Sequence, residues 1–388
     1  MFKIQTLNKI SPAGLNLLPR DDYEVASEIH HPDAILVRSA AMHDLELPAT
    51  LKAIARAGAG VNNIPVDKCS QKGILVFNTP GANANGVKEL VIASLILASR
   101  NVVQAASWAK TLVGKGAEME KLMEKGKSTY AGTEIRGKKL GVIGLGKIGV
   151  IVANDAEALG MEVTGFDPAI SVEAAWGLSR TVKRARGLDS LIAESDYISL
   201  HVPLMDKTKG MINAEKFAIM KKGVKIVNFA RGGLVNNKDL KAALADGTIG
   251  CYVTDFPDDD MLQQEKAICI PHLGASTNES EDNCANMAVQ QLRDYLENGN
   301  IRNSVNYPDC ELPRSGKQRL IVANANVPNM VGQITSSLAE KKINIGEMLN
   351  KSKGDYAYNI IDTDSVIDED VVKHIQGISG VIMTRVLG

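Results

Sequence analysis

Residues 138–167 read KKLGVIGLGKIGVIVANDAEALGMEVTGFD, and this stretch decides the fold of the chain. It opens with a short apolar run, residues 140–143, of the length typical of a buried parallel strand. A helical pattern follows over residues 148–159, and residues 162–166 form a second apolar run. Strand, helix and strand in this order predict a βαβ unit.

Three glycines join the first predicted strand to the helix in G-x-G-x-x-G spacing. Gly144 allows the tight turn, Gly146 lets the backbone approach a pyrophosphate, and Gly149 lets the helix pack closely on the strand. The helix N-terminus adds free N–H groups and a partial positive charge for the phosphates. In this context the motif predicts a dinucleotide-binding site.

Asp167 ends the second predicted strand and selects between the two nicotinamide dinucleotides. A carboxylate here accepts hydrogen bonds from the ribose hydroxyls of the adenosine and repels a 2′-phosphate. We therefore predict NAD as the cofactor.

Length and composition set the class of protein. The chain has 388 residues, more than one core usually holds, so we expect two or three domains. Its apolar fraction of 45%, charged fraction of 23% and net charge of −1 are ordinary for a globular protein. This net charge gives no reason to expect nucleic acid or an acidic membrane as a partner, and we predict neither.

Cysteine usage and the first residues indicate a reducing compartment. The five cysteines are odd in number and form no C-x-x-C pair, which argues against disulfides and against a zinc site. The opening MFKIQTLNKI lacks the apolar core of a signal peptide, and no run reaches the roughly 18 apolar residues of a membrane span. We expect a cytoplasmic protein without a bound metal.

The first hundred residues repeat a strand-then-helix rhythm, which predicts a small parallel α/β domain. Its predicted strands are residues 3–7, 34–37 and 74–77. Ligands of open α/β sheets bind at the carboxyl ends of strands. The candidate substrate contacts at these ends are Arg38, Ser39, residues 59–63 and residues 78–83. The alternative is ordinary turn chemistry, since Asn, Gly and Pro favour turns for backbone reasons.

Two helical patterns precede the glycine motif. Residues 87–100 are apolar nearly all round, which fits a buried helix between two domains. Residues 102–127 are richer in Lys and Glu. This second segment is either an arm that covers a neighbouring subunit or an ordinary surface helix.

Four further predicted strands follow Asp167, and their carboxyl ends share the sheet edge of the glycine motif. They are residues 197–202 with His201 and Pro203, 225–229 with Arg231, 250–254 with Asp255, and 267–270 with His272. Arg231 suits bidentate capture of a substrate carboxylate. His272 has the intrinsic acidity for moving a proton at a substrate hydroxyl near neutral pH. For a single histidine the alternative is a structural role, and we expect His201 to pack near the cofactor.

The C-terminal part reads as a separate module. Residues 304–317 are polar and contain prolines, which predicts a linker. Residues 318–388 show strand, helix, strand, strand, helix, strand, the order of a ferredoxin-like domain.

Motifs along nearly the whole chain resemble those of the D-isomer-specific 2-hydroxyacid dehydrogenases, and within them the branch that acts on D-3-phosphoglycerate. They are LVRSA (36–40), RAGAGVNNI (56–64), FNTPGANANGVKELV (77–91), GVIGLGKIG (141–149), HVPLMDKT (201–208), NFARGGLV (228–235) and PHLGAST (271–277). The resemblance implies an α/β fold with two Rossmann-like, doubly wound parallel-sheet domains and a C-terminal regulatory βαββαβ domain of the ACT type. The implied bounds are residues 1–93 with 282–303 for the substrate domain, 94–281 for the NAD-binding domain, and 318–388 for the ACT-type domain.

The resemblance also implies site residues. Arg231 is the substrate-binding arginine and His272 the acid/base. The implied cofactor contacts are Gly144, Gly146, Lys147, Ile148, Gly149, Asp167, His201, Pro203, Thr208, Phe229, Ala230, Arg231, Thr254, Asp255, His272 and Gly274. The implied substrate contacts are Arg38, Ser39, Arg56, Gly60, Val61 and Asn83, with Arg56 matching an arginine that reaches a neighbour's substrate phosphate.

The chain departs from the family pattern at the acid that partners the histidine. The family places a glutamate there, and alignment on Phe256 and Pro257 brings Asp259 to that position. We take Asp259 as the expected partner of His272, with Asp258 and Asp260 as alternatives. The family's aspartate near the nicotinamide falls on Thr254, so that Asp255 is one step late.

The implied activity is oxidation of D-3-phosphoglycerate to 3-phosphohydroxypyruvate with NAD, the first step toward L-serine, in a homodimer or homotetramer. Asn324, Asn326 and Asn344 lie near the family's L-serine effector positions. The alternative for the tail is a domain that only assembles subunits. The alternative activities are oxidation of another D-2-hydroxy acid, or a binding protein that senses NAD(H).

Overall fold

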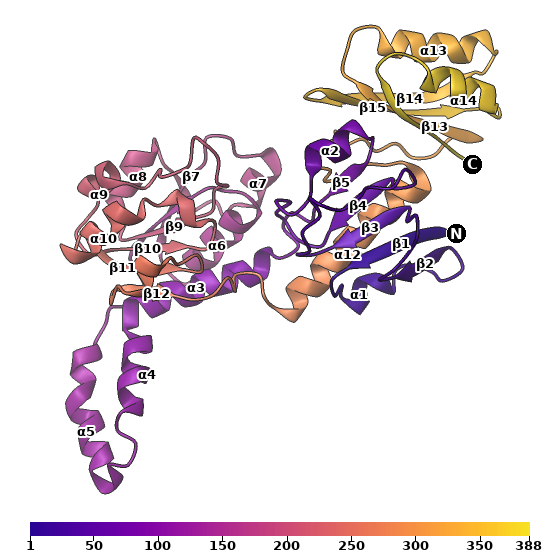
Figure 1. Ribbon diagram of the computed structural model, residues 1–388. Helices are drawn as coiled ribbons and strands as arrows, with labels where there is room; N and C mark the ends of the chain where they lie inside the picture. The colour runs from indigo at the N-terminus through magenta and orange to yellow at the C-terminus, as the bar shows by residue number, and fades with distance from the viewer. The chain divides into compact units, whose positions relative to one another are not determined.

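The computed structural model describes all 388 residues, which form two compact units. We call residues 84–277 the central unit, and residues 1–83 with 278–388 the terminal unit. The resemblance implies divisions at 93/94 and 281/282. Both fall inside continuous helices, α3 (Ala84–Arg100) and α12 (Asn278–Asn298), and each helix belongs whole to one unit (Figure 1).

The central unit is built on a seven-stranded sheet in which every pairing is parallel. The strand order is β12-β11-β10-β9-β6-β7-β8. The strands are β6 (Lys139–Ile143), β7 (Glu162–Phe166), β8 (Lys183–Arg184), β9 (Tyr197–Leu200), β10 (Val224–Asn228), β11 (Ile249–Thr254) and β12 (Ala267–Cys269). The order reverses between β6 and β9, and ligands of such sheets bind at this switch point. The predicted Rossmann-like sheet is confirmed.

Helices cover both faces of this sheet (Figure 1). One face packs against α3 and α6 (Lys147–Ala158), with Val91, Val152 and Leu140 fully buried between them. The other packs against α8 (Leu188–Glu194), α9 (Ala214–Ile219) and α10 (Asn237–Ala245). Strands buried on both faces are expected to be largely apolar, and all four residues of β9 are buried. The edge strand β8 was not predicted, because Lys-Arg carries no apolar signal.

Residues 102–130 form a helical hairpin that projects from the central unit (Figure 1). Its helices are α4 (Val102–Lys110) and α5 (Met119–Gly126). The Trp108 and Tyr130 rings pack 5.4 Å apart, and only Leu112 is buried. The single predicted helical segment is therefore two antiparallel helices with little core between them.

The terminal unit contains a five-stranded parallel sheet in the order β2-β1-β3-β4-β5. Its strands are β1 (Phe2–Leu7), β2 (Tyr23–Ala26), β3 (Ala34–Val37), β4 (Ala53–Arg56) and β5 (Leu75–Phe77). Three had been predicted. β4 was not, because its sequence AIAR has one β-branched residue and two alanines, which do not favour strands.

The first half of the segment predicted as a linker, residues 304–310, is packed into the terminal unit. Tyr307 and Cys310 are fully buried, and Val305 N donates to the Val76 carbonyl of edge strand β5. The Asn306 side chain accepts from Val76 N and donates to the Ile74 carbonyl. This segment therefore pairs the free edge of the sheet, although its polar composition predicts exposure to solvent.

The C-terminal residues confirm the predicted ferredoxin-like module. Its elements are β13 (Gln318–Ala325), α13 (Met330–Glu340), β14 (Ile345–Lys353), β15 (Tyr356–Thr363), α14 (Glu369–Gln376) and β16 (Val381–Leu387). The sheet is antiparallel with the order β14-β15-β13-β16, and both helices cover one face (Figure 1).

The other face of this sheet packs into the core of the terminal unit. Ile321 and Tyr358 share a buried cluster with Phe77 and Tyr295, and Tyr358 Oη donates to the Gly299 carbonyl at 2.8 Å. Arg319 is fully buried and forms a bidentate ion pair with Asp362 at 2.6 and 2.7 Å. Arg319 also donates to backbone carbonyls of residues 298, 312 and 313, so that its donors are satisfied as burial requires.

No single helix is long and apolar enough to cross a membrane; α3 and α4 reach that length only together, across a bend of 67°.

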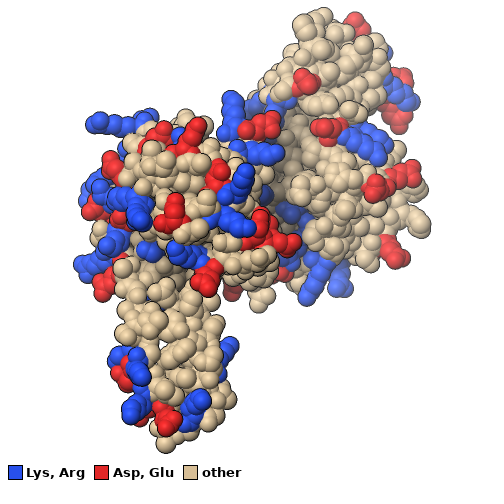
Figure 2. Space-filling model, turned by 60° about the vertical axis from the view of Figure 1, so that its left-hand side comes forward, with Lys and Arg blue, Asp and Glu red and all other residues tan.

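All five cysteines are free thiols. Acidic and basic side chains are interspersed over the face shown in Figure 2, and on the hairpin they gather toward its free end.

Candidate active site

The glycine turn between β6 and α6 has the geometry of a phosphate-binding turn. Gly144 has a φ of +93°, and a side chain at Gly149 would collide with the Gly144 carbonyl. No atom lies within 4 Å of the position that a Gly146 side chain would take. The turn therefore leaves open space in front of the N-terminus of a 12-residue helix, where Lys147 and Ile148 supply first-turn N–H groups.

Asp167 follows β7 beside this turn. Its carboxylate oxygens accept from Leu145 N and Ala169 N, both at 2.8 Å. Each oxygen keeps a lone pair for a further donor, such as a ribose hydroxyl. The open turn and the adjacent carboxylate together fit the adenosine and pyrophosphate of NAD.

His201 and Thr208 shape the loop after β9. His201 N donates to the Ile143 carbonyl, and its Nε2 lies 2.8 Å from Ser199 Oγ. Burial lowers the pKa of His201 to about 4, so the ring is neutral at pH 7. Thr208 Oγ1 donates to the Pro203 carbonyl and closes the loop on itself. His201 therefore lies against the glycine turn without carrying charge.

Arg231 is held at the carboxyl end of β10 by a buried asparagine. Asn228 is fully buried, donates to the Arg231 carbonyl at 3.0 Å and accepts from Ala230 N at 3.2 Å. This fixes the backbone from Phe229 to Arg231, while the Arg231 guanidinium stays exposed and donates to the Ala230 carbonyl. An exposed guanidinium on a rigid turn suits capture of a carboxylate.

Phe256 brings Arg231 and His272 to one place. Its ring lies 4.6 Å from the His272 ring, and the Arg231 guanidinium carbon lies 6.0 Å from its centroid. The structure therefore assembles the two residues predicted for the chemistry around one aromatic side chain.

Two further predicted cofactor residues are buried at the end of β11. Thr254 is fully buried, and its Oγ1 accepts from Phe256 N. Asp255 is 2% exposed, and its Oδ2 accepts from Gly274 N at 3.0 Å. Burial raises the pKa of the Asp255 carboxyl, and the charges of His272 and Arg231 oppose that rise.

The three acids considered as partners of His272 begin the short helix α11 (Asp259–Leu262). Asp258 caps this helix at Met261 N and pairs with Asn237, and Asp260 forms an ion pair with Lys241 at 2.9 Å. Asp259 is exposed. None of the three has a hydrogen bond or ion pair with His272.

The terminal unit holds the candidate substrate residues, at the carboxyl ends of β3, β4 and β5. Arg38 Nη1 forms an ion pair with Glu281 Oε1 of α12 at 2.7 Å. Arg56 Nε donates to the Arg38 carbonyl at 2.9 Å, which places the two arginines side by side. Ser39 N donates to Asn8 Oδ1 at 3.1 Å.

The glycine-rich loop carrying Gly60 and Val61 is tied to the loop that ends at Asn83. Asn78 donates to the Ala59 carbonyl at 2.6 Å, and Thr79 N donates to the Gly58 carbonyl at 3.1 Å. The predicted substrate residues therefore lie at one edge of this sheet, Arg56 as the last residue of β4 and the other five on loops.

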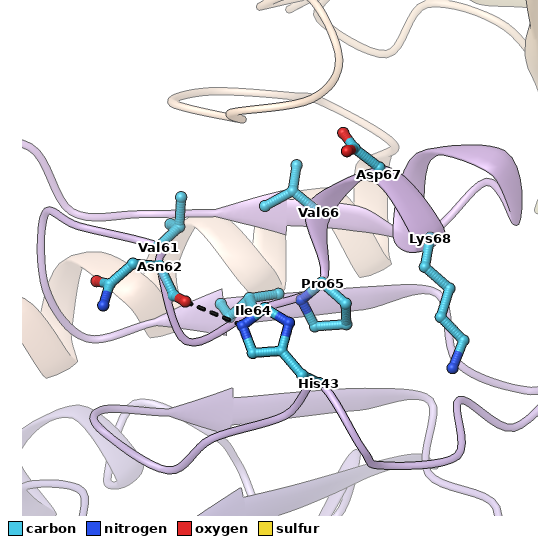
Figure 3. Close-up of a pocket in the computed structure, with 8 residues that line it drawn as sticks. All are labelled: His43, Val61, Asn62, Ile64, Pro65, Val66, Asp67 and Lys68. Carbon is cyan, nitrogen blue, oxygen red and sulfur yellow. Dashed lines mark hydrogen bonds between the residues drawn. The ribbon is translucent and has the colours of Figure 1, made fainter. Parts of the chain in front are cut away.

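A pocket of about 690 Å³ lies beside this loop, lined by His43, Val61, Asn62, Ile64, Pro65, Val66, Asp67 and Lys68 (Figure 3). His43 Nε2 is 3.0 Å from the Asn62 carbonyl, and Asp67 and Lys68 point away from each other. Of the predicted substrate residues, only Val61 lines it.

The predicted effector residues do not meet within one chain. Asn324 is buried, and its Oδ1 accepts from Asn359 at 2.7 Å. Asn326 donates to the Gly354 carbonyl at one end of the tail sheet, whereas Asn344 donates to Asp364 at the opposite end.

Three supporting residues were missed from the sequence: Asn228, Phe256 and Glu281. Asn228 and Phe256 stand within the motifs NFARGGLV and DFP, so their positions next to Arg231 and Asp255 were a usable signal. Glu281 had no local signal, because its partner Arg38 lies on a distant segment.

Comparison with known proteins agrees with this architecture. The family model described as D-isomer specific 2-hydroxyacid dehydrogenase, NAD binding domain, matches residues 92–274. A D-3-phosphoglycerate dehydrogenase of Methanocaldococcus jannaschii is 35% identical over 335 residues, covering 84% of this chain and 61% of that protein. One from Haemophilus influenzae is 31% identical over 355 residues, covering 88% and 83%.

A solved structure shows the same likeness. The crystal structure of NAD+-bound 3-phosphoglycerate dehydrogenase of Entamoeba histolytica aligns with a TM-score of 0.60 and 26% identity, covering 79% of this chain and 98% of that chain. The chain spans 61% and 59% of the lengths of the Methanocaldococcus jannaschii and Bacillus subtilis relatives. With 31% identity to a relative of which it covers 83%, the chain belongs to the D-isomer specific 2-hydroxyacid dehydrogenase family.

Proposed function

We propose that this protein oxidises D-3-phosphoglycerate to 3-phosphohydroxypyruvate with NAD, a first step toward L-serine. The observation that carries the proposal is the grouping of Arg231 and His272 around Phe256, at the sheet edge that also carries the glycine turn and Asp167. Relatives of 31–37% identity named D-3-phosphoglycerate dehydrogenase support it.

Each residue has a distinct role in this proposal. Bound NAD supplies the acceptor for the hydride that leaves C2 of the substrate. Asp167 accepts hydrogen bonds from the ribose hydroxyls of NAD, and the glycine turn with Lys147 and Ile148 binds the pyrophosphate. Arg231 binds the substrate carboxylate, which orients C2 and polarises the C2 oxygen as it becomes a carbonyl. His272 takes the hydroxyl proton in the same step.

The phosphate end of the substrate is assigned to the terminal unit. Arg38 and Arg56 lie side by side, and Ser39, Gly60, Val61 and Asn83 supply polar and backbone groups around them. A guanidinium from each of these arginines would favour a dianionic phosphate over a neutral hydroxymethyl group.

A second candidate is oxidation of an unphosphorylated D-2-hydroxy acid. The observation that favours it is the Arg38–Glu281 ion pair, because a carboxylate already balances one of the two positive charges. The panel experiment below separates the two candidates.

The test is a steady-state assay of the purified chain with NAD and D-3-phosphoglycerate, D-glycerate, D-lactate and D-2-hydroxyglutarate. We expect kcat/KM to be highest for D-3-phosphoglycerate. A higher value for any unphosphorylated acid would favour the second candidate, and no turnover with any of them would favour an NAD(H)-binding protein.

We also propose a homodimer or homotetramer in which the hairpin of residues 102–130 contacts another subunit. Val102, Val103, Val113 and Met119 are large apolar residues left exposed on it. Since Asn326 and Asn344 lie at opposite ends of the tail sheet, an L-serine site built from both requires two copies of the tail. Light scattering gives the subunit number, and a thermal shift with L-serine, absent in Asn344→Ala, tests the effector.

A further inference from the structure

One buried carboxylate oxygen in the central unit has no hydrogen-bond partner. Asp255 is 2% exposed; its Oδ2 accepts from Gly274 N, whereas its Oδ1 is enclosed and unpartnered. Buried carboxylate oxygens without a donor are unfavourable and therefore rare in folded proteins. This oxygen calls for a donor that the described conformation does not supply.

The surroundings of Asp255 indicate that donor. Gly274, which Asp255 holds, is two residues from His272. The ring of Phe256, the residue after Asp255, packs against the His272 ring with 4.6 Å between the ring centroids. The cationic groups that act on Asp255 are His272 and Arg231, and both favour its ionised form. The Arg231 guanidinium already donates to the Ala230 carbonyl.

The neighbouring acids are committed to other groups. Asp258 caps α11 and accepts from Asn237, and Asp260 pairs with Lys241. Asp259 lies exposed in the first turn of α11, where it complements the helix dipole. Asp259 is exposed on α11 and makes no contact with His272, whereas Asp255 holds the loop of His272 through Gly274 and lies close enough for the imidazole charge to act on its carboxylate.

We propose that Asp255, rather than Asp259, is the positioning carboxylate of His272. In the reacting state its Oδ1 accepts a hydrogen bond from one imidazole N–H, while the other imidazole nitrogen receives the proton of the substrate hydroxyl. The imidazolium formed in that step is then stabilised by the carboxylate beside it. This inference rests on the proposed function for the role of His272, but the contact itself is independent of the substrate.

The first test replaces the charge and keeps the shape. In Asp255→Asn the amide oxygen can still accept from Gly274 N, but the amide NH2 group takes the place of Oδ1 and cannot accept a hydrogen bond from the histidine. NMR of histidine-labelled full-length protein follows the imidazole titration of His272, assigned with His272→Gln. We expect its midpoint to fall by about one pH unit in Asp255→Asn, the loss of one close opposite charge, and to stay in place in Asp259→Asn. An unchanged midpoint in Asp255→Asn, or an equal fall in Asp259→Asn, overturns the proposal.

A reciprocal test does not depend on Asp255→Asn folding. In His272→Gln, which alters an exposed side chain, the pKa of the Asp255 carboxyl should rise further, because one of the two cations that oppose burial is removed. Carboxyl NMR measures it, and an unchanged Asp255 pKa overturns the proposal.

A third readout separates the histidine from the cofactor as the donor to Oδ1. With the holoenzyme, Asp255→Asn should move the pH dependence of kcat/KM to lower pH, and fluorescence titration measures the affinity of the same variant for NADH. Loss of NADH affinity with an unmoved His272 titration would assign Oδ1 to the cofactor and overturn the proposal. Because both NMR tests use no substrate, they decide the contact even where the proposed activity fails.

Discussion

Arg38 and Glu281 form an ion pair with 2.7 Å between Nη1 and Oε1, so the arginine assigned to the substrate phosphate already has a carboxylate partner. Their side chains are 38% and 39% exposed, and such pairs contribute about 0–1 kcal/mol. A dianionic phosphate can therefore displace Glu281 at small cost. The pair keeps Arg38 ordered and makes every anionic ligand compete with a resident carboxylate.

Glu281→Gln should strengthen binding of the phosphorylated substrate. Removing the competing charge lowers KM for D-3-phosphoglycerate by up to about fivefold, which corresponds to ~1 kcal/mol. The effect should shrink for D-glycerate, which lacks the phosphate. The matched control is Glu279→Gln. Glu279 lies two residues before Glu281 in the first turn of α12 and forms no ion pair. Equal KM values in the parent and Glu281→Gln would show that Arg38 does not bind the phosphate.

Arg56→Ala should damage use of D-3-phosphoglycerate far more than use of D-glycerate. Arg56 lies against the Arg38 backbone, and in the proposed function it adds a second guanidinium for the phosphate. The readout is the ratio of kcat/KM for the two substrates, with Arg56→Lys as the variant that retains charge. If both substrates lose activity equally, Arg56 serves to hold the Arg38 loop instead.

Asp167→Ala should narrow the preference for NAD over NADP by about 1–3 kcal/mol, the range for a mispaired buried polar contact. The carboxylate that repels the 2′-phosphate is lost, together with its bonds to Leu145 N and Ala169 N. Asp167→Asn removes the negative charge but keeps an acceptor for one of these N–H groups. It therefore separates the effect of the charge from the effect of the hydrogen bonds that support the turn. Similar Kd values for NADH and NADPH in the parent protein would contradict the assignment.

His272→Ala should reduce kcat by roughly 10²–10⁴, the usual contribution of a positioned acid–base group. KM for NAD should change little, because the cofactor is held mainly by the glycine turn and Asp167. His43→Ala, which alters an exposed histidine of the terminal unit, is the control. A loss of less than about tenfold would remove His272 from the proton transfer.

His201 should make the folded state less stable in mild acid. Burial lowers its folded-state pKa from 6.5 to about 4, so the unfolded chain binds this proton more readily between those values. The stabilisation is complete above pH 6.5 and is lost as pH falls toward 4. Between pH 7 and pH 5 this group should remove about 2 kcal/mol from the free energy of unfolding.

Urea unfolding at pH 7 and pH 5 measures that loss. His201→Gln, which cannot be protonated, should lose about 2 kcal/mol less than the parent over this interval, and exposed His30→Gln should behave as the parent. If His201→Gln and the parent show the same pH dependence, the imidazole is protonated equally in the folded and unfolded states.

Patterns local to the chain determined the architecture. The apolar runs before Gly144 and Asp167, the glycine spacing and the strand–helix rhythm are readable because period and turn chemistry depend on neighbouring residues. The same holds for the tail, whose order of strand, helix, strand, strand, helix and strand was predicted. Arg231 and His272 followed from their places at strand ends, because all parallel strands present their carboxyl ends at one edge.

Tertiary structure alone decided the charge partners and the packing of polar segments. No local pattern links Arg38 to Glu281, or Arg319 to Asp362, because side-chain pairing depends on which elements the fold brings together. Residues 304–310 are mostly buried although the segment is polar, since Val305 and Asn306 pair the edge of β5. Alignment favoured Asp259 as the partner of His272, but α11 holds Asp259 at the surface. Asp255, in contrast, is buried at the end of β11. A carboxylate's role is set by its burial and its donors, which sequence position does not specify.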